Sequence, residues 1–321
     1  MMTRKFFLLL LVSVILVATA GHSTVSLYND DSSGTTSDKQ EVYPIAIDED
    51  HFPDSAFRAL LMTYNWASDG LLTEEEANGM TLLANPLSPE FKNTGVKSLK
   101  GIEFFPQLMH LDFSGHQLTE VDISKNTELT ILELSNNQLI SIDLSNNLNL
   151  IDIHLSDNRL TTIDLSKNES VVDVWLQNNQ LISLDLSGLT NLEILYCFGN
   201  QIKGEAMDAL IASLRSTDLS HNLSSPALLY GINTDDPNEG NVITKAQVAS
   251  AQAKGWKVRD WVNRYGDDEY LGSDEFETTV RSVTSPNPGA SPVIYDLQGR
   301  RLLAKPQKGV YIQNGKKIVV K

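Results

Sequence analysis

The chain has 321 residues and a formal net charge of −16, with 41 Asp and Glu against 25 Lys and Arg. This charge disfavours nucleic acid and anionic membrane surfaces as partners, because both are themselves negatively charged. The single cysteine, Cys197, excludes an intramolecular disulfide and a zinc site built from cysteines.

Residues 1–20 have the three parts of a secretory signal peptide. A basic start precedes the apolar run Phe6–Val17, and Ala18 and Ala20 form a small-x-small cleavage site. We therefore expect a secreted or outer-cell-surface protein. Residues 21–42, which are rich in Ser, Thr, Asp and Gly, predict a disordered spacer. No later stretch approaches the roughly 20 apolar residues that a membrane span needs.

Residues 43–95 predict a helical N-terminal cap. Pro53 precedes a helical pattern with Phe57, Leu60 and Leu61 on one face. A cap is needed at this end because the first strand of a repeat sheet would otherwise expose unpaired backbone groups.

The segment from Asn65 to Glu76 has the outline of an EF-hand calcium loop. Gly70 stands at its sixth position and Glu76 at its twelfth, which makes Asn65, Asp69 and Glu76 the candidate calcium ligands. Ala67 replaces a usual ligand and Asn65 a usual charge, so binding weaker than about 10⁻⁴ M is expected. The alternative is a helix–turn–helix that binds no calcium, and no other cofactor is predicted.

Residues 96–203 contain a leucine-rich pattern that returns every 21 residues. The copy beginning at Leu129 reads L-x-x-L-x-L-x-x-N-x-L, and it recurs from Leu108, Leu150, Val171 and Leu192. Such a pattern predicts a leucine-rich-repeat horseshoe, an α/β-type solenoid whose stacked turns share one core and one parallel sheet. Ladder residues Asn137, Asn158, Asn179 and Asn200 are expected to satisfy buried backbone groups between turns.

The short strand of each turn is expected to project alternate residues onto an open sheet face. On the last turns this alternation places Trp175, Tyr196, Phe198 and Ile194 outward. Aromatic side chains are costly to leave in water and are typical of binding surfaces. The predicted ligand-binding residues are Trp175, Tyr196, Phe198, Ile194, His154, Glu133 and Asp173. The alternative is that the C-terminal cap folds over the aromatic residues.

The second half of each turn carries a repeated aspartate. Because apolar neighbours flank it, the side chain is expected to point outward, and the carboxylates are expected to be solvated and hydrogen-bonded locally. A ladder of bound cations is the alternative. The aspartates are Asp122, Asp143, Asp164 and Asp185.

The remaining chain predicts a C-terminal cap, a linker and a separate β module. Residues 204–268 contain two helical patterns and two short strands, and the proline-containing residues 269–292 predict a linker. Residues 293–321 hold seven Lys and Arg against one Asp, and their apolar alternation around Asn314-Gly315 predicts a β-hairpin.

The repeats together with both caps resemble the secreted leucine-rich-repeat proteins of Bacteroidetes, called BspA-like or internalin-like. The motifs that carry the resemblance are Phe52-Pro53-Asp54, Ser98-Leu99-Lys100-Gly101-Ile102-Glu103 and Gly240-Asn241-Val242. The tail from Tyr295 to Lys317 is similar to the sorting module of the type IX secretion route. The resemblance implies a surface protein that binds a host or microbial protein or glycan, without naming the ligand or the oligomeric state. It also leaves open whether the tail is cleaved or retained.

Three classes of function compete: a binding protein, a structural surface spacer and an enzyme. The sequence contains no H-E-x-x-H, no G-x-S-x-G and no phosphate-binding loop. The prediction is a non-enzymatic adhesin or recognition protein that uses the concave face of its repeats, with a spacer or scaffold as the alternative.

Overall fold

The computed structural model describes residues 42–63, 68–83, 95–217, 227–261 and 268–273, together with the backbone of four short strands between 294 and 320. The predicted signal peptide, most of the spacer and most of the linker lie outside the described residues. Among the described helices, none is both long and apolar enough to span a bilayer.

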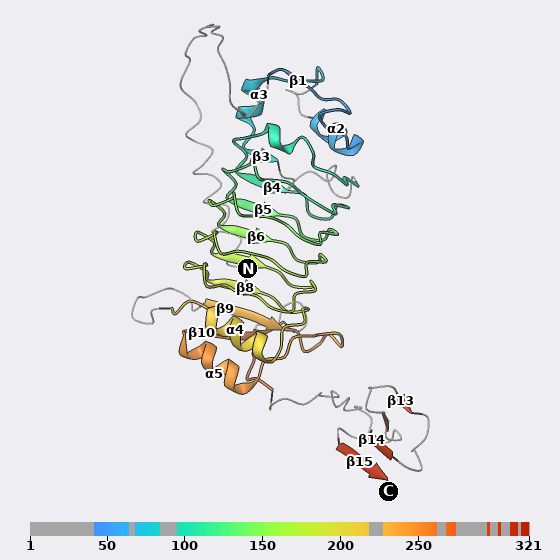
Figure 1. Cartoon of the computed structure of the whole chain (residues 1–321), viewed down its shortest axis with the longest axis vertical. Helices are drawn as coiled ribbons and strands as arrows, with labels where there is room; N and C mark the ends of the chain where they lie inside the picture. Colours follow the sequence, from blue (N-terminus) through green and yellow to red (C-terminus); the bar gives the residue numbers. More distant parts are fainter. Residues whose placement is uncertain are drawn as a thin grey trace, which may run out of the picture. The chain divides into compact units, whose positions relative to one another are not determined.

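The described residues build one long sheet with a turn of chain behind each strand (Figure 1). Eight neighbouring strands, β3 to β10, are parallel, and β11 pairs antiparallel with β10 at the edge. The central turns are in register: Leu111 pairs with Leu132, which in turn pairs with Ile153, and Ile153 pairs with Val174. The strands are β3 (Leu82–Leu83), β4 (His110–Asp112), β5 (Ile131–Glu133), β6 (Asp152–His154), β7 (Asp173–Trp175), β8 (Ile194–Tyr196), β9 (Ala227–Ile232), β10 (Trp256–Asp260) and β11 (Asp268–Glu269).

The predicted asparagine ladder is confirmed and extends by one member. In Asn158, Oδ1 accepts the Leu139 N–H at 3.0 Å, while Nδ2 donates to the carbonyls of Leu134 at 2.9 Å and Leu155 at 3.1 Å. Asn137, Asn179 and Asn200 repeat this geometry, and Asn241 adds it in the C-terminal cap. Each amide thus satisfies at least three backbone groups that are buried at a corner of the solenoid.

A second asparagine ladder, which the sequence analysis missed, runs behind the sheet. Asn126, Asn147 and Asn168 are fully buried, and each donates to two carbonyls of the preceding turn. Phe105, 21 residues before Asn126, and Leu189, 21 residues after Asn168, occupy the corresponding positions, so the ladder ends at both sides in the apolar core.

The N-terminal cap consists of α2 (Ser55–Leu61), α3 (Glu74–Gly79) and the pair β1 (Ile45–Ala46) with β2 (Leu71–Leu72). As predicted, Phe57, Leu60 and Leu61 are the buried face of α2. Asp54 ties the cap to the solenoid, because Oδ1 caps α2 and Oδ2 accepts the N–H groups of Lys97 at 2.7 Å and Ser98 at 3.1 Å. β3 then joins the sheet beside β4, one strand earlier than the sequence analysis places its start.

The C-terminal cap packs α4 (Glu205–Ser213) and α5 (Lys245–Ala253) beside the last parallel strands (Figure 1). α5 begins with a capping box in which Thr244 and Gln247 satisfy each other's backbone N–H groups. Trp256 is buried and donates its indole N–H to the Arg215 carbonyl at 2.9 Å. The helices therefore close the core where the repeats stop.

The C-terminal segment forms a sheet of its own with the order β13-β12-β14-β15. The predicted hairpin is confirmed, because β14 pairs antiparallel with β15 and Gln313 lies opposite Lys316. The strands are β12 (Ile294–Tyr295), β13 (Arg301–Leu302), β14 (Gly309–Gln313) and β15 (Lys316–Val320).

We expect Asn158→Ala to lower the free energy of unfolding by about 2–4 kcal/mol, because it leaves buried backbone groups without partners. The matched control is Asn146→Ala, at an exposed position of the preceding turn, which should change it by no more than about 0.5 kcal/mol. Chemical denaturation followed by circular dichroism measures both. Equal effects of the two substitutions would show that the ladder does not stabilise the solenoid.

Candidate binding face on the repeat sheet

Two columns of side chains project from the open face of the sheet. One column is His110, Ile131, Asp152, Asp173 and Ile194, and the other is Asp112, Glu133, His154, Trp175 and Tyr196. All ten are partly exposed, whereas the central residue of each of these strands is buried. Predicted residues Trp175, Tyr196, Ile194, His154, Glu133 and Asp173 thus share one face.

The second column continues as a stack of aromatic rings. Centroids lie 4.6 Å apart between His154 and Trp175, 4.7 Å between Trp175 and Tyr196, and 4.4 Å between Tyr196 and Tyr230. The spacing follows the distance between strands, about 4.8 Å, because each ring comes from the same position of the next strand. The sequence analysis missed Tyr230, since β9 does not keep the 21-residue step from β8.

The expectation that Phe198 lies on the open face is wrong. Phe198 is only 5% exposed and stacks against Trp261, with ring centroids 5.7 Å apart and planes at 14°. Trp261 also meets Tyr196 and Tyr230 edge-on, each at 5.7 Å. Trp261, which comes from the C-terminal cap, therefore covers one end of the aromatic stack. Trp175 and His154 lie at the other end.

A carboxylate bridges two histidines across three neighbouring strands. Glu133 accepts a hydrogen bond from His110 Nε2 at 3.1 Å and lies 3.6 Å from His154 Nδ1. Burial opposes ionisation of Glu133, but the two imidazoles outweigh it and lower the pKa of Glu133 from 4.5 to about 2. Burial likewise opposes a charged His154, yet Glu133, Asp173 and Asp152 together raise the pKa of His154. This bridge loses its contribution to stability as the pH falls from about 4.5 toward 2, where Glu133 is protonated, and also as the pH rises through the raised pKa of His154, where the imidazole loses its charge.

The carboxyl groups of Asp173 and Asp152 have raised pKa values, whereas the pKa of Glu133 is lowered. Burial raises the pKa of Asp173 to about 6, and the charge of His154 and the 2.9 Å hydrogen bond from the Trp175 indole N–H offset this only in part. Burial, together with the neighbouring Glu133, also raises the pKa of Asp152. In the described part of the chain, neither carboxylate forms a salt bridge with a lysine or arginine. Holding them ionised at neutral pH therefore costs folding free energy.

In the loop predicted to bind calcium, the two described candidate ligands have structural roles. Glu76 Oε2 accepts from the Thr73 N–H at 2.8 Å and from the Thr73 hydroxyl at 2.6 Å, which caps α3. Asp69 Oδ1 accepts the Leu71 N–H at 3.0 Å. Asn65 lies outside the described residues. Across the ranges that the structure describes, no three His, Cys, Asp or Glu side chains gather as metal ligands. Calcium binding at this loop stays a prediction.

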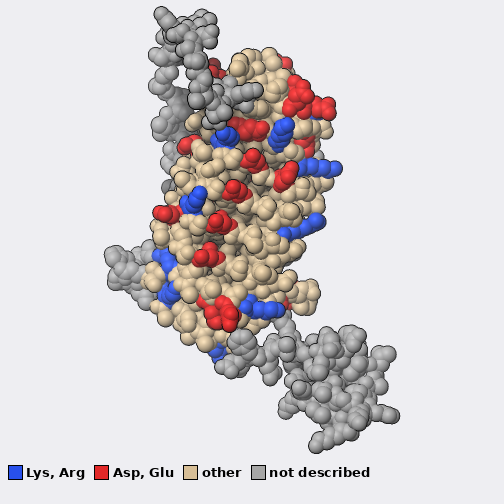
Figure 2. All heavy atoms as spheres, in the orientation of Figure 1, with Lys and Arg blue, Asp and Glu red and all other residues tan. Residues whose placement is uncertain are grey.

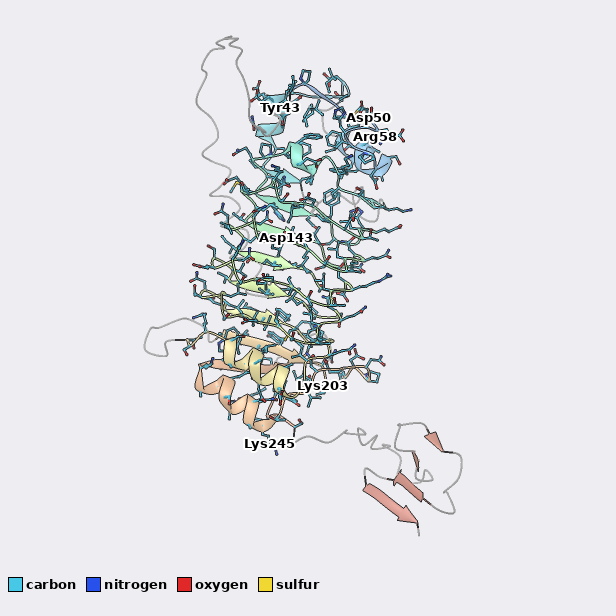
Figure 3. All side chains as sticks on the ribbon, viewed as in Figure 1. Tyr43, Asp50, Arg58, Asp143, Lys203 and Lys245 are labelled. Atoms are coloured by element: carbon cyan, nitrogen blue, oxygen red, sulfur yellow. The ribbon has the colours of Figure 1, made fainter. Side chains whose placement is uncertain are left out.

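The repeated aspartates lie on the return half of each turn, away from the strands. Asp143 Oδ1 accepts the Ser145 N–H at 2.9 Å, and Asp122, Asp164 and Asp185 repeat this bond with their own serines. Figure 2 shows acidic side chains following one another over the turns on the face in view, and Figure 3 labels Asp143 in the middle of them. The predicted locally hydrogen-bonded, solvent-facing column is confirmed.

Stacked turns, an in-register parallel sheet and the asparagine ladder define this chain as a leucine-rich-repeat solenoid. Internalin C2 from Listeria monocytogenes has a similar structure, with a TM-score of 0.53 and 22% identity over 73% of this chain and 96% of that chain. An internalin (inlF) from the same species has a TM-score of 0.42 and 20% identity over 68% of this chain and 73% of that chain. The functional domain of InlJ from the same species has a TM-score of 0.32 and 18% identity over 68% of this chain and 57% of that chain. No family model and no curated protein matches the sequence.

Asp173→Asn should stabilise the protein at neutral pH. Because the folded-state pKa is raised above the usual 3.8, the carboxyl favours folding only when protonated, and this benefit disappears as the pH rises through about 6. An amide retains the oxygen that accepts from Trp175. We expect a gain of about 1–3 kcal/mol at pH 7.5 and little change at pH 3.5, measured by chemical denaturation. The control Asp143→Asn, on the exposed column, should give no comparable gain. An Asp173→Asn variant that is no more stable than wild type at pH 7.5 would contradict the conclusion that burial of the Asp173 carboxylate costs stability.

Proposed function

We propose that this chain is a non-enzymatic, secreted or cell-surface recognition protein that binds a protein or glycan on the open face of its repeat sheet. The observation that supports it best is the half-exposed aromatic stack of Trp175 and Tyr196 beside carboxylates that destabilise the fold. Groups kept at a cost to stability are typical of functional sites. Repeat solenoids commonly present such extended sheet faces to partners.

The proposed ligand contacts are Trp175, Tyr196, Ile194, His154, Glu133 and Asp173. Phe198 acts by supporting Trp261, which holds the covered end of the stack. The proposed location follows from the predicted signal peptide and from the absence of a membrane-spanning helix among the described residues. A structural spacer is the second candidate, and it would have no need of the destabilising pair Asp152 and Asp173 on this face.

The test is a binding screen of the mature protein against host matrix proteins and glycans, with variants measured on each hit. Trp175→Ala combined with Tyr196→Ala should lose at least about 2 kcal/mol of binding, or roughly 30-fold in Kd, because ring contacts dominate such interfaces. The control is Ile140→Ala with Ile182→Ala, two side chains that are 63% exposed and lie off the sheet strands. Circular dichroism verifies folding of all variants. Wild-type affinity in the folded aromatic variant would refute the proposal.

We further propose that residues 293–321 are a separate module for export or surface retention. Their four-stranded sheet is distinct from the repeat sheet, and the segment carries seven Lys and Arg against one Asp on an acidic chain. Two of its four strands are only two residues long, shorter than strands usually are, so we expect the module to be weakly stable by itself, which suits recognition by an export apparatus.

Deleting residues 293–321 should leave the melting temperature of the repeat solenoid nearly unchanged, since no strand of the long sheet is lost. The truncated protein should change its location in the native cell, measured by fractionation and surface labelling. A truncated protein that unfolds, or that still reaches the surface normally, would contradict the assignment.

A further inference from the structure

The aromatic stack presents the edges of its rings rather than their faces. His154 and Tyr196 come from the strands on either side of Trp175 and pack against the two sides of the indole, at centroid distances of 4.6 and 4.7 Å and with ring planes tilted by 33° and 47°. Tyr196 is covered in the same way by Trp175 and by Tyr230, whose ring is parallel to it within 3°. A ligand that approaches the sheet beside Trp175 therefore meets mainly ring edges, which are the electropositive rims of the π-systems, whereas Trp261 already packs edge-on against Tyr196 and Tyr230.

This geometry disfavours a sugar ring stacked on Trp175. A pyranose packs its C–H groups on an aromatic face, and a cation also binds over the face of a ring. Ring edges instead suit carbonyl oxygens, apolar side chains and other aromatic rings, which a polypeptide supplies.

Among the described residues, no lysine or arginine pairs with the carboxylates of this face, and the charge of His154 offsets the burial of Asp152 and Asp173 only in part. Asp152 and Asp173 are in register on β6 and β7, about one strand spacing apart. Glu133 contacts both histidines, and Asp173 accepts a hydrogen bond from the Trp175 indole N–H and one from the backbone of Val174. The raised pKa values of both aspartates agree with two carboxylates that lack sufficient positive charge nearby.

We propose that the partner is a protein that inserts an arginine or lysine side chain between Asp152 and Asp173 while its backbone and apolar side chains lie along the edges of Trp175 and Tyr196. This inference rests on the proposed function and specifies its partner. A guanidinium is planar and offers paired donors, so one arginine can bind both carboxylates at once. Charge complementarity of this kind favours partner selection.

The experiment measures fluorescence anisotropy of three labelled probes: a peptide of nine arginines, a peptide of nine glutamates and a neutral glucose hexasaccharide. Measurement at 150 mM NaCl screens exposed charges at long range. The test variant is Asp152→Asn with Asp173→Asn, and the matched control is Asp143→Asn with Asp164→Asn. Both variants remove two charges from neighbouring turns, but the control removes them from the exposed column that contains Asp143 (Figure 3).

We expect the arginine peptide to bind the wild type and the control variant with equal Kd, and to bind the test variant at least about tenfold more weakly. An equal loss in both variants would show that overall charge attracts the peptide, and would overturn the inference. Two further results would also overturn it. One is failure of the arginine peptide to bind the wild type. The other is binding of the hexasaccharide or the glutamate peptide that is lost in the Trp175→Ala and Tyr196→Ala variant. In that last case the proposed binding face stands and only the partner class fails. Wild-type affinity of the aromatic variant for the hits of the screen would instead refute the proposed function.

Discussion

The solenoid depends on the hydrogen bonds that the ladder asparagines make at each corner. A chain that turns sharply next to an apolar core leaves backbone N–H and carbonyl groups that no strand can reach. The amide of Asn158 satisfies three of them and joins its own turn to the preceding one, because it accepts from Leu139 and donates to Leu134 and Leu155. The left-handed residue before it, Asp157, bends the chain so that the amide points inward. With one such residue per turn, every strand is held in register with the last.

This register creates the proposed binding face. Since β5 to β8 are held in register, residues at the same position of each turn line up in columns, and the rings of His154, Trp175 and Tyr196 become a continuous row. The same alignment brings Glu133 between His110 and His154 and sets Asp152 beside Asp173. Favourable and unfavourable charge arrangements therefore occur on one sheet. The first stabilises the fold, whereas the second costs stability and is where we propose that the cation of a partner binds.

Features with a fixed period could be predicted from the sequence, and features that depend on non-repeating contacts could not. The strands, the asparagine ladder, the capping box at Thr244 and the outward column through Trp175 all follow from spacing and alternation. The ladder of Asn126, Asn147 and Asn168 has the same 21-residue signal and could have been found. Burial of Phe198 could not, because Trp261 reaches it from a segment with no repeat register. Tyr230 joins the stack for the same non-periodic reason, and a two-residue strand such as β3 carries no alternation to recognise.

Trp175 and Tyr196 in the aromatic stack are each flanked by rings from the neighbouring strands, and this limits how the surface can evolve. Gene duplication of one whole turn inserts one strand into the sheet and moves everything beyond it by one strand spacing, about 4.8 Å. The distance between the acidic pair and the covered end of the aromatic stack can therefore change only in steps of that size. A lineage of such proteins could match partners whose charged and apolar groups are spaced differently by counting turns, without altering any contact inside a turn.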